Sequence, residues 1–405
     1  MLLLCTLAAL ILANTPLQEQ YLAFWQTKLT FGLGPWQMSH SLQHWINDGL
    51  MTVFFFVIGL EVKRELVLGE LRTLRRATLP VVAAIGGMVV PALCYVALQG
   101  DGEAASGWGI PMATDIAFVV GCLTLLSTRV PSSLRVLLLS LAIADDIGAI
   151  LVIAVGYTQG INATALGLGL GGLALVFLLA RLGMRSIGVY IIVGGLVWLA
   201  FHASGVHATI SGVALGLLTP ARNLISTGGF RQRMERAAAI MAGDGWKNRG
   251  ARVGHLRQVQ SAARDVVSPV EYIESVMHPW VGFAIMPIFA LANAGVAFHV
   301  SDLTQPVALA VSAGLVLGKP LGIVLFCFLA VRLKLASLPQ GVTWPILSAG
   351  ACLAGIGFTM ALFIAGLSLE GAPLQYAKVG VLAASALAAL LGLTLLWRLL
   401  PPAKA

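Results

Sequence analysis

The sequence has little charge and is dominated by long apolar stretches. Of its 405 residues, 10% are charged and 58% are hydrophobic, whereas soluble domains carry about 25% charged residues. This shortage of charge excludes an ordinary water-soluble globular protein. Uncharged runs of about 20 residues are typical of membrane-spanning helices, and outer-membrane barrels show a much weaker alternating pattern. We therefore expect an all-α integral membrane protein that forms a single membrane domain over residues 1–405.

The chain also lacks any pairing pattern among its cysteines. Five cysteines stand apart in apolar segments: Cys5, Cys94, Cys122, Cys327 and Cys352. Their spacing predicts neither a disulfide framework nor a cysteine metal site, and we find no cofactor motif. A net charge of +8 would suit a nucleic-acid partner, but the distribution of the basic residues favours membrane topology. Membrane lipid is therefore the expected partner, and no nucleic acid is expected.

Turn residues and charge clusters divide the chain into twelve candidate spans. Their approximate bounds are 1–14, 40–62, 79–98, 107–126, 134–156, 163–180, 187–201, 205–219, 275–298, 306–331, 343–367 and 375–397. The first is shorter than the roughly 20 residues that a spanning helix needs, so we expect a first helix with a trimmed start. Residues 25–37 alternate and contain Gly-Leu-Gly-Pro, which predicts a short hairpin outside the membrane.

Basic residues are concentrated in alternate connections between these spans. Of the 25 lysines and arginines, 22 lie in the connections after spans 2, 4, 6, 8 and 10 and in the C-terminal segment. The opposite connections hold Lys28, with Lys378 expected at an outer helix end. The positive-inside rule therefore predicts an inner (cytoplasmic) membrane protein with both termini in the cytoplasm. The 221–270 segment is expected to be a basic cytoplasmic loop attracted to anionic lipid.

Four ionisable residues fall deep inside candidate spans: Asp115, Asp145, Asp146 and Lys319. Asp145 is roughly 16 Å from either end of its helix, close to mid-membrane. An unpaired charge there costs at least about 2.5–3.5 kcal/mol, so each group must pair, neutralise or face water. Adjacent helical residues point about 100° apart, so the two neighbouring aspartates need different partners. One candidate is Lys319, and the other is a mobile cation or a proton.

A purely structural explanation of these charges is also available. Asp145 and Lys319 would then form a static ion pair, while backbone and water would satisfy the other two carboxyl groups. Three carboxylates against one lysine leave negative charge unbalanced, however, which favours a functional site. Oxygen-rich acidic sites suit hard cations.

Glycine, proline and threonine interrupt two of the spans. Gly109–Phe118 reads GIPMATDIAF and contains Thr114 and Asp115, and Ala354–Met360 reads AGIGFTM and contains Gly355 and Gly357. Interrupted spans expose half-helix ends at mid-membrane, with positive N-termini that attract an anion and negative C-termini that attract a cation. The alternative is that Gly and Pro are simply common in membrane helices.

Together these stretches resemble the NhaA-type sodium/proton antiporters, in order along residues 40–370. The motifs are GLEVKRE (59–65), ATDIAF (113–118), LAIADDIGAI (141–150), SGVHATISG (204–212), HPWV (278–281), FALANAGV (289–296), GKPLGI (318–323) and CLAGIGFTM (352–360). The resemblance implies twelve transmembrane helices, inverted three-helix repeats over about 79–156 and 306–397, and two discontinuous helices that cross at mid-membrane. It also implies electrogenic exchange of intracellular Na+ or Li+ for external H+ by alternating access.

By motif match, the resemblance assigns roles to individual residues. Asp145 and Asp146 would carry the cation and the protons, Thr114 and Asp115 would lie beside them, and Lys319 would pair with Asp145 until sodium displaces it.

The resemblance further suggests pH sensing at Glu61, Glu65, Glu274 and His207, and a homodimer contact through the outer hairpin. Glu61 and Glu65 stand one helical turn apart, where like charges repel. They are equally consistent with ordinary interfacial charges paired with Lys63 and Arg64. His207 is equally consistent with a structural histidine at a helix start.

Three other functions were considered. A sodium-coupled transporter of a small organic solute would need a larger pocket with hydrogen-bonding or aromatic groups. An intramembrane aspartyl protease would carry a Gly-x-Gly-Asp motif, and no aspartate of this sequence lies in one. A channel is disfavoured because a lysine beside the carboxylates suits charge compensation through a cycle. We therefore expect a transporter and not an enzyme.

Overall fold

The structure is a computed structural model of the whole chain. It describes residues 1–33, 36–100, 104–126, 129–158, 160–184, 187–221 and 267–401, with isolated positions between these ranges. The predicted basic loop at 221–270 therefore falls largely outside the described residues.

Apart from one hairpin, the regular elements of the described residues are helices. Eight helices are long and apolar enough to span a membrane, or ten if two bent pairs each count as one span. Two shorter apolar helices, Gly188–Ser204 and Thr209–Leu218, accompany them. The predicted class of helical membrane protein is confirmed, while the number twelve stays a prediction.

The elements follow the chain in a simple order. They are α1 Leu2–Ala13, α2 Gln18–Gln26, β1 Lys28–Leu33, β2 Trp36–Ser41, α3 Leu42–Trp45, η1 Ile46–Leu50, α4 Met51–Val67, η2 Glu70–Arg72, α5 Leu74–Gln99, η3 Ala105–Met112, α6 Ile116–Leu125, α7 Ser132–Gly156, α8 Ala163–Arg181, α9 Ile187–Ser204, α10 Thr209–Leu218, α13 Pro269–Trp280, η5 Val281–Ile285, α14 Met286–Asn293, η6 Val300–Thr304, α15 Pro306–Ala313, η7 Gly314–Gly318, α16 Lys319–Arg332, α17 Trp344–Ala354, α18 Phe358–Ser368 and α19 Gly371–Leu399.

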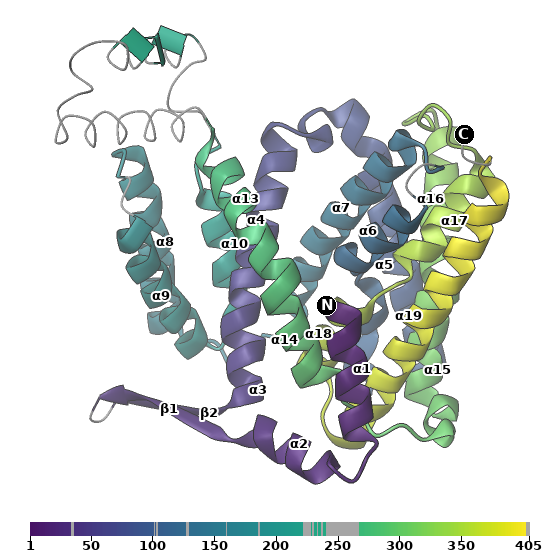
Figure 1. Cartoon of the computed structure of the whole chain (residues 1–405), viewed down its shortest axis with the longest axis horizontal. Helices are drawn as coiled ribbons and strands as arrows, with labels where there is room; N and C mark the ends of the chain where they lie inside the picture. The colour runs from purple at the N-terminus through teal and green to yellow at the C-terminus, as the bar shows by residue number, and fades with distance from the viewer. Residues whose placement is uncertain are drawn as a thin grey trace.

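The long helices stand roughly side by side (Figure 1). Helices α8 and α9 lie at one edge, and α5, α6, α7, α16, α17 and α19 gather at the opposite side. The antiparallel pair β1–β2 runs across one end of the bundle, with Lys28 opposite Ser41. This hairpin extends beyond the predicted 25–37, because β2 continues to Ser41, whose hydroxyl then caps α3 by accepting from the His44 amide.

Two predicted boundaries were wrong for identifiable reasons. The span expected at 275–298 begins at Pro269, because Ser268 and Glu271 form a capping box that starts α13 earlier. It ends at Asn293. Lys378 was expected at a helix end, but α19 begins at Gly371, so this lysine lies two turns inside the helix and is buried.

Glycine pairs bring the helices into close contact. A Cβ added at Gly322 of α16 would lie 2.0 Å from the carbonyl oxygen of Gly86 in α5. A Cβ at Gly216 of α10 would lie 2.8 Å from the Cα of Gly59 in α4. Membrane helices lack a hydrophobic force between them, and small residues that permit close backbone approach supply the packing instead.

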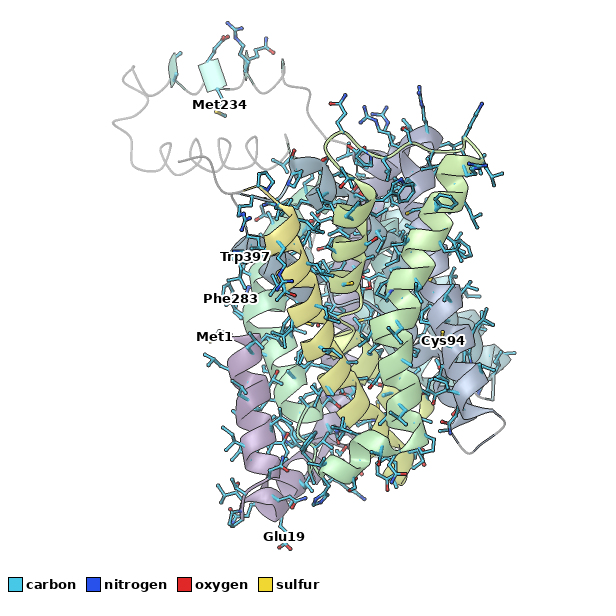
Figure 2. All side chains as sticks on the ribbon, turned by 90° about the vertical axis from the view of Figure 1, so that its right-hand side faces the viewer. Met1, Glu19, Cys94, Met234, Phe283 and Trp397 are labelled. Atoms are coloured by element: carbon cyan, nitrogen blue, oxygen red, sulfur yellow. The ribbon has the colours of Figure 1, made fainter. Side chains whose placement is uncertain are left out.

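Large apolar side chains cover the outside of the bundle. Phe283 and Trp397 are 74% and 61% exposed, and both project from its flank in Figure 2, whereas the acidic Glu19 lies at one end. A soluble monomer rarely exposes so much contiguous apolar surface. This surface matches the lipid-facing side of a multi-pass membrane protein.

Candidate functional site

The two neighbouring aspartates lie in the middle of α7. Asp145 and Asp146 are the fourteenth and fifteenth residues of this 25-residue helix, and their exposed fractions are 1% and 2%. Alanine and isoleucine neighbours in LAIADDIGAI give the helix no other polar group at this level. Both carboxyl groups therefore depend on other helices or on ions for their partners.

Lys319 is the first of these partners. Its Nζ lies 2.6 Å from Oδ2 of Asp145, and both side chains are fully buried. The same ammonium donates to the main-chain carbonyl of Met112. The helix widens into the π-helical turn η7 just before Lys319, and such turns are frequent at functional sites. The structure thus has the ion pair that the sequence analysis considered.

One oxygen of each aspartate has no hydrogen-bond partner among the described residues. These atoms are Oδ1 of Asp145 and Oδ1 of Asp146, and both are inaccessible to solvent. Buried polar atoms are almost always hydrogen-bonded, so each unpaired one needs an explanation. A cation that contacts both oxygens, or a proton on each carboxyl group, would supply the missing partners.

Two interrupted segments meet beside this pair. The first break separates η3 from α6 at residues 113–115, and the second separates α17 from α18 at residues 355–357, where the two helices are bent by 48°. The Asp115 amide donates to the Ile356 carbonyl at 2.7 Å, and the Thr114 hydroxyl donates to the Ala354 carbonyl at 3.0 Å. Residues of the first break therefore satisfy main-chain carbonyl groups at the second break.

Asp115 caps two helices with one carboxylate. Its Oδ1 accepts from the Phe118 amide at 3.0 Å in the first turn of α6. Its Oδ2 accepts from the Thr359 amide at 3.1 Å in the first turn of α18, and also from the Thr359 hydroxyl. A negative group at two helix N-termini is stabilised by both helix dipoles.

The opposite ends of the interrupted segments also have partners. Met112, whose carbonyl accepts from Lys319, is the last residue of η3, and Ala354, whose carbonyl accepts from Thr114, is the last residue of α17. Orphan carbonyls at a helix C-terminus attract positive charge and hydrogen-bond donors. The negative charge of Asp115 and the positive charge of Lys319 therefore have the signs that these helix ends attract.

Gly355 and Gly357 permit close approach at the second break. A Cβ on Gly355 would lie 2.5 Å from the carbonyl oxygen of Leu315 in η7, and one on Gly357 would lie 3.0 Å from the Leu315 side chain. Neither glycine has a positive φ. The two glycines therefore let the break pack closely against the π-helical turn that precedes Lys319. Their requirement comes from this close contact and not from a strained backbone conformation.

Two further residues contribute to this site and were not expected from the sequence. Thr359 lies inside the GIGFTM stretch, two positions after Gly357, and this spacing from the break was the available signal for a first-turn residue. Ser385 of α19 accepts from the Phe358 amide at 3.0 Å. No local pattern marks Ser385, because its role depends on which helix packs against the break.

The whole chain is also similar to known proteins. A family profile described as Na+/H+ antiporter 1 matches residues 1–396. The chain belongs to this family.

Curated members of the family cover nearly the whole chain. A protein of Rhodopirellula baltica named Na(+)/H(+) antiporter NhaA is 54% identical over 404 residues, which are 100% of this chain and 92% of the relative. A protein of Rhizobium meliloti with the same name is 54% identical over 401 residues, or 99% and 92%. Among solved structures, the sodium proton antiporter MjNhaP1 of Methanocaldococcus jannaschii superposes with a TM-score of 0.52 at 12% identity, covering 98% of this chain and 92% of that one. The last likeness concerns the fold alone.

In this member of the Na+/H+ antiporter 1 family, three glutamates surround Arg64. The Arg64 guanidinium donates to Oε1 of Glu274, and its Nη2 lies 3.7 Å from Oε1 of Glu65. Glu65 also accepts from the Glu70 amide at 3.0 Å, while Oε2 of the buried Glu274 has no partner among the described residues. Glu61 lies on α4, the helix of Arg64 and Glu65, and is within electrostatic range of Asp146 on α7. The cluster is thus an ion-paired network that reaches toward the aspartates.

His207 lies apart from both groups, in the turn between α9 and α10. Its carbonyl accepts from the Ile210 amide at 3.0 Å, and its ring packs edge-on against Phe363 at 6.2 Å between centroids. Its buried Nδ1 has no partner in the described part of the chain. Burial lowers the pKa of His207, neighbouring Asp48 opposes the shift, and His44 and His202 add to it.

Proposed function

We propose that this protein is an electrogenic secondary antiporter that exchanges intracellular Na+ or Li+ for external H+. The observation that carries the proposal is the pair of unpartnered carboxylate oxygens on Asp145 and Asp146 in a dry, mid-helix position. Membership of the Na+/H+ antiporter 1 family supports the same cargo. The transported ions are the substrates, and no cofactor is required.

The charge balance at the site supports one cation at a time. With all groups ionised, Asp115, Asp145 and Asp146 carry three negative charges against the single positive charge of Lys319. The N-termini of α6 and α18 contribute about +0.5 each toward Asp115. About one negative charge remains, and one Na+ or Li+ neutralises it. Two protons on Asp145 and Asp146 replace that ion when it leaves, which makes the exchange electrogenic.

Competition for the same oxygens couples the two flows. Both carboxylates must be ionised to hold the cation, so cation affinity falls as the pH falls. Sodium between the aspartates weakens the contact of Lys319 with Asp145 and frees the ammonium. Alternating access then exposes the loaded site to one side of the membrane at a time.

The proposal also covers the topology, the oligomeric state and the pH response of the antiporter. The carrier is symmetric: it has twelve spans, inverted repeats over 79–156 and 306–397, and a crossing of the two interrupted helices. The 22 basic residues in alternate connections support an inner membrane protein with both termini in the cytoplasm. A homodimer forms through the β1–β2 hairpin, and Glu61, Glu65, Glu274 and His207 adjust activity to pH.

Exchange in everted membrane vesicles tests the proposal. A pH-sensitive dye reports the respiration-driven proton gradient, and addition of Na+ or Li+ collapses that gradient when the antiporter is active. Asp146→Asn should abolish the collapse between pH 6 and 9, while Asp302→Asn, the same change in the distant η6 turn, should retain it. Full salt-driven collapse by Asp146→Asn, at equal protein in the membrane, would refute the assignment.

A further inference from the structure

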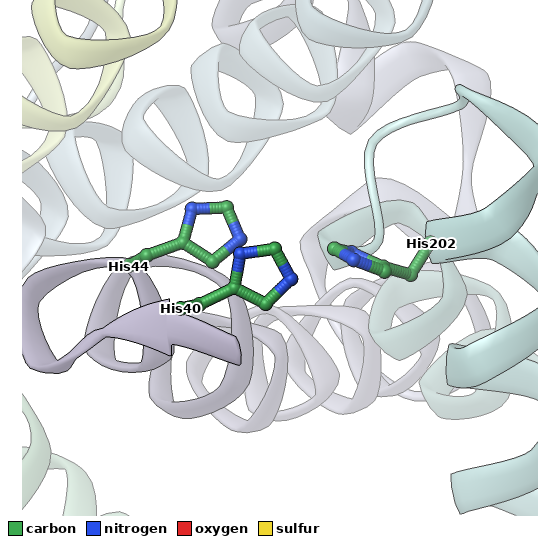
Figure 3. Close-up of side chains that lie close together, drawn as sticks. All are labelled: His40, His44 and His202. Carbon is green, nitrogen blue, oxygen red and sulfur yellow. The ribbon is translucent and has the colours of Figure 1, made fainter. Parts of the chain in front are cut away.

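Three histidines from different parts of the chain meet at the hairpin end of the bundle. His40 lies near the end of β2, His44 lies in α3 and His202 lies near the end of α9. One ring nitrogen from each can be chosen so that the three atoms lie within 4.8 Å of one another. Figure 3 shows the His40 and His44 rings on one side and the His202 ring facing them from the other. None of the three belongs to the ion-exchange site.

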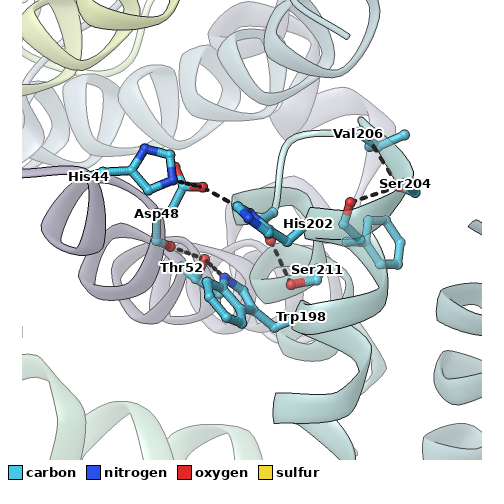
Figure 4. Close-up of polar contacts among 10 residues, drawn as sticks. His44, Asp48, Thr52, Trp198, His202, Ser204, Val206 and Ser211 are labelled. Carbon is cyan, nitrogen blue, oxygen red and sulfur yellow. Dashed lines mark hydrogen bonds and ion pairs between the residues drawn. The ribbon is translucent and has the colours of Figure 1, made fainter. Parts of the chain in front are cut away.

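A buried carboxylate completes the group. Oδ2 of Asp48 lies 3.5 Å from Nε2 of His44 and 3.4 Å from Nδ1 of His202, between the two rings in Figure 4. The contact to His44 does not have hydrogen-bond geometry, and its buried Nε2 has no hydrogen-bond partner among the described residues. An unpartnered ring nitrogen of His44 and a carboxylate oxygen shared with His202 thus lie close together.

We infer that His40, His44, Asp48 and His202 form a binding site for a divalent transition metal, with Zn2+ the best match. Zinc is bound tetrahedrally by imidazole nitrogen and carboxylate oxygen at about 2.0–2.2 Å, which places neighbouring ligand atoms about 3.4 Å apart. The two Asp48 contacts already have this length. The His40 ring stacks on the His44 ring, with centroids 4.2 Å apart, so His40 would have to turn its side chain to reach the same ion. Imidazole ligands suit transition metals such as zinc, whereas sites built from oxygen ligands alone suit hard cations such as Mg2+ and Ca2+.

The surroundings hold two of the ligands in place. The carbonyl of Asp48 accepts from the Thr52 hydroxyl at 2.5 Å, and that hydroxyl accepts from the Trp198 indole at 3.0 Å. The His202 ring stacks on Trp198, with centroids 5.6 Å apart and planes 17° apart (Figure 4). Ligand orientation by such outer contacts is characteristic of functional metal sites. The His44 side chain is 40% exposed, which leaves a path for the ion.

A metal here would fasten the base of the hairpin to α9. The ligands at positions 40, 44 and 48 are separated from His202 by more than 150 residues of chain. Binding to the folded state alone stabilises it according to metal concentration. Zinc should therefore raise the unfolding temperature of the protein without entering the transport cycle.

Metal binding by the purified full-length chain in detergent tests this inference. The protein should carry an affinity tag without histidine, and competition with a chromophoric chelator gives the affinity and stoichiometry for Zn2+. We expect one high-affinity Zn2+ per chain and a zinc-dependent rise in unfolding temperature. Loss of one ligand should weaken binding at least about 10- to 100-fold, the loss that outer-shell changes alone produce. His202→Ala and His44→Ala are the test variants, and His278→Ala, an exposed histidine on α13, is the matched control.

A spectroscopic measurement keeps the test decisive if a variant folds poorly. Co2+ bound to the wild-type protein should show the intense visible absorption of a tetrahedral site, and Zn2+ should displace it. The inference would be overturned if the wild type bound no zinc, or if His278→Ala weakened zinc binding as much as His202→Ala does. Sodium-driven exchange is measured in parallel, so failure of the metal site is distinguishable from failure of the antiporter proposal.

Discussion

Asp115 is the most informative residue to perturb, because one carboxylate serves two interrupted helices. Asp115→Ala removes three accepted hydrogen bonds, from the Phe118 amide, the Thr359 amide and the Thr359 hydroxyl. The hydroxyl can turn toward another acceptor, but the two amides are fixed by their helices. We therefore expect both α6 and α18 to lose their N-terminal caps in a site that water does not reach.

The structure sets the size of the effect. A buried donor left unpaired costs about 1–3 kcal/mol, so two unpaired amides predict a loss of about 2–6 kcal/mol in the free energy of unfolding. Asp115→Asn keeps one acceptor oxygen and should lose about half as much. Thr359→Val keeps the shape and the amide and removes only the hydroxyl, so it should cost about 1 kcal/mol.

Unfolding in mixed micelles of mild detergent and dodecyl sulfate, followed by circular dichroism, measures these differences. Asn162→Ala is the matched control, because Asn162 caps α8 through the Thr164 and Ala165 amides at an exposed position where water replaces the lost acceptor. It should cost only about 0.5–1 kcal/mol. If Asp115→Ala were no more destabilising than Asn162→Ala, the double-cap interpretation would be wrong.

Two further substitutions test the packing of charge and backbone around the site. Lys319→Met should destabilise the protein by about 3–5 kcal/mol at alkaline pH, because it leaves Asp145 buried without its counter-ion. The double variant with Asp145→Asn should recover much of that loss in the same unfolding assay. A double variant as unstable as the single one would contradict the argument. Gly355→Ala should cost about 1–3 kcal/mol and slow exchange, because its Cβ would meet the Leu315 carbonyl at 2.5 Å. A Cβ at Gly366, in α18 of the same interrupted span, meets nothing within 4 Å, so Gly366→Ala should gain about 0.5–1 kcal/mol. Equal effects of the two substitutions would exclude a steric cause.

The class of protein and the location of its unusual charges could be predicted from the sequence. Composition alone indicated a helical membrane protein, because few soluble folds tolerate so little charge. Asp145 and Lys319 stood out because an isolated charge in hydrocarbon requires a partner, and only one cationic side chain lay at matching depth. The interruptions near Asp115 and Gly355 were visible as Gly, Pro and Thr inside apolar runs.

Other features depend on contacts between distant segments. The start of α13 was missed although Ser268 and Glu271 carry a local capping signal, since the apolar pattern was given more weight than the cap. Ser385 and the carbonyl of Met112 had no such signal. The histidine group was invisible for the same reason, because His202 joins His40 and His44 only after α9 has packed beside α4 and the hairpin has folded back.

The difference follows from what compensates each charge. When a lysine pairs with an aspartate, both charged side chains can be identified in the sequence, so the buried charge and its counter-ion are both predictable. Asp115 is instead met by the amides at the beginning of α6 and α18, and Lys319 by the carbonyl at the end of η3. Every residue has such amides and carbonyls, and only the fold decides which of them are left free at a helix end. The sequence therefore predicts the ionisable side chains of an intramembrane ion site and the presence of half-helix ends beside them, but not which main-chain amides and carbonyls hold each charge.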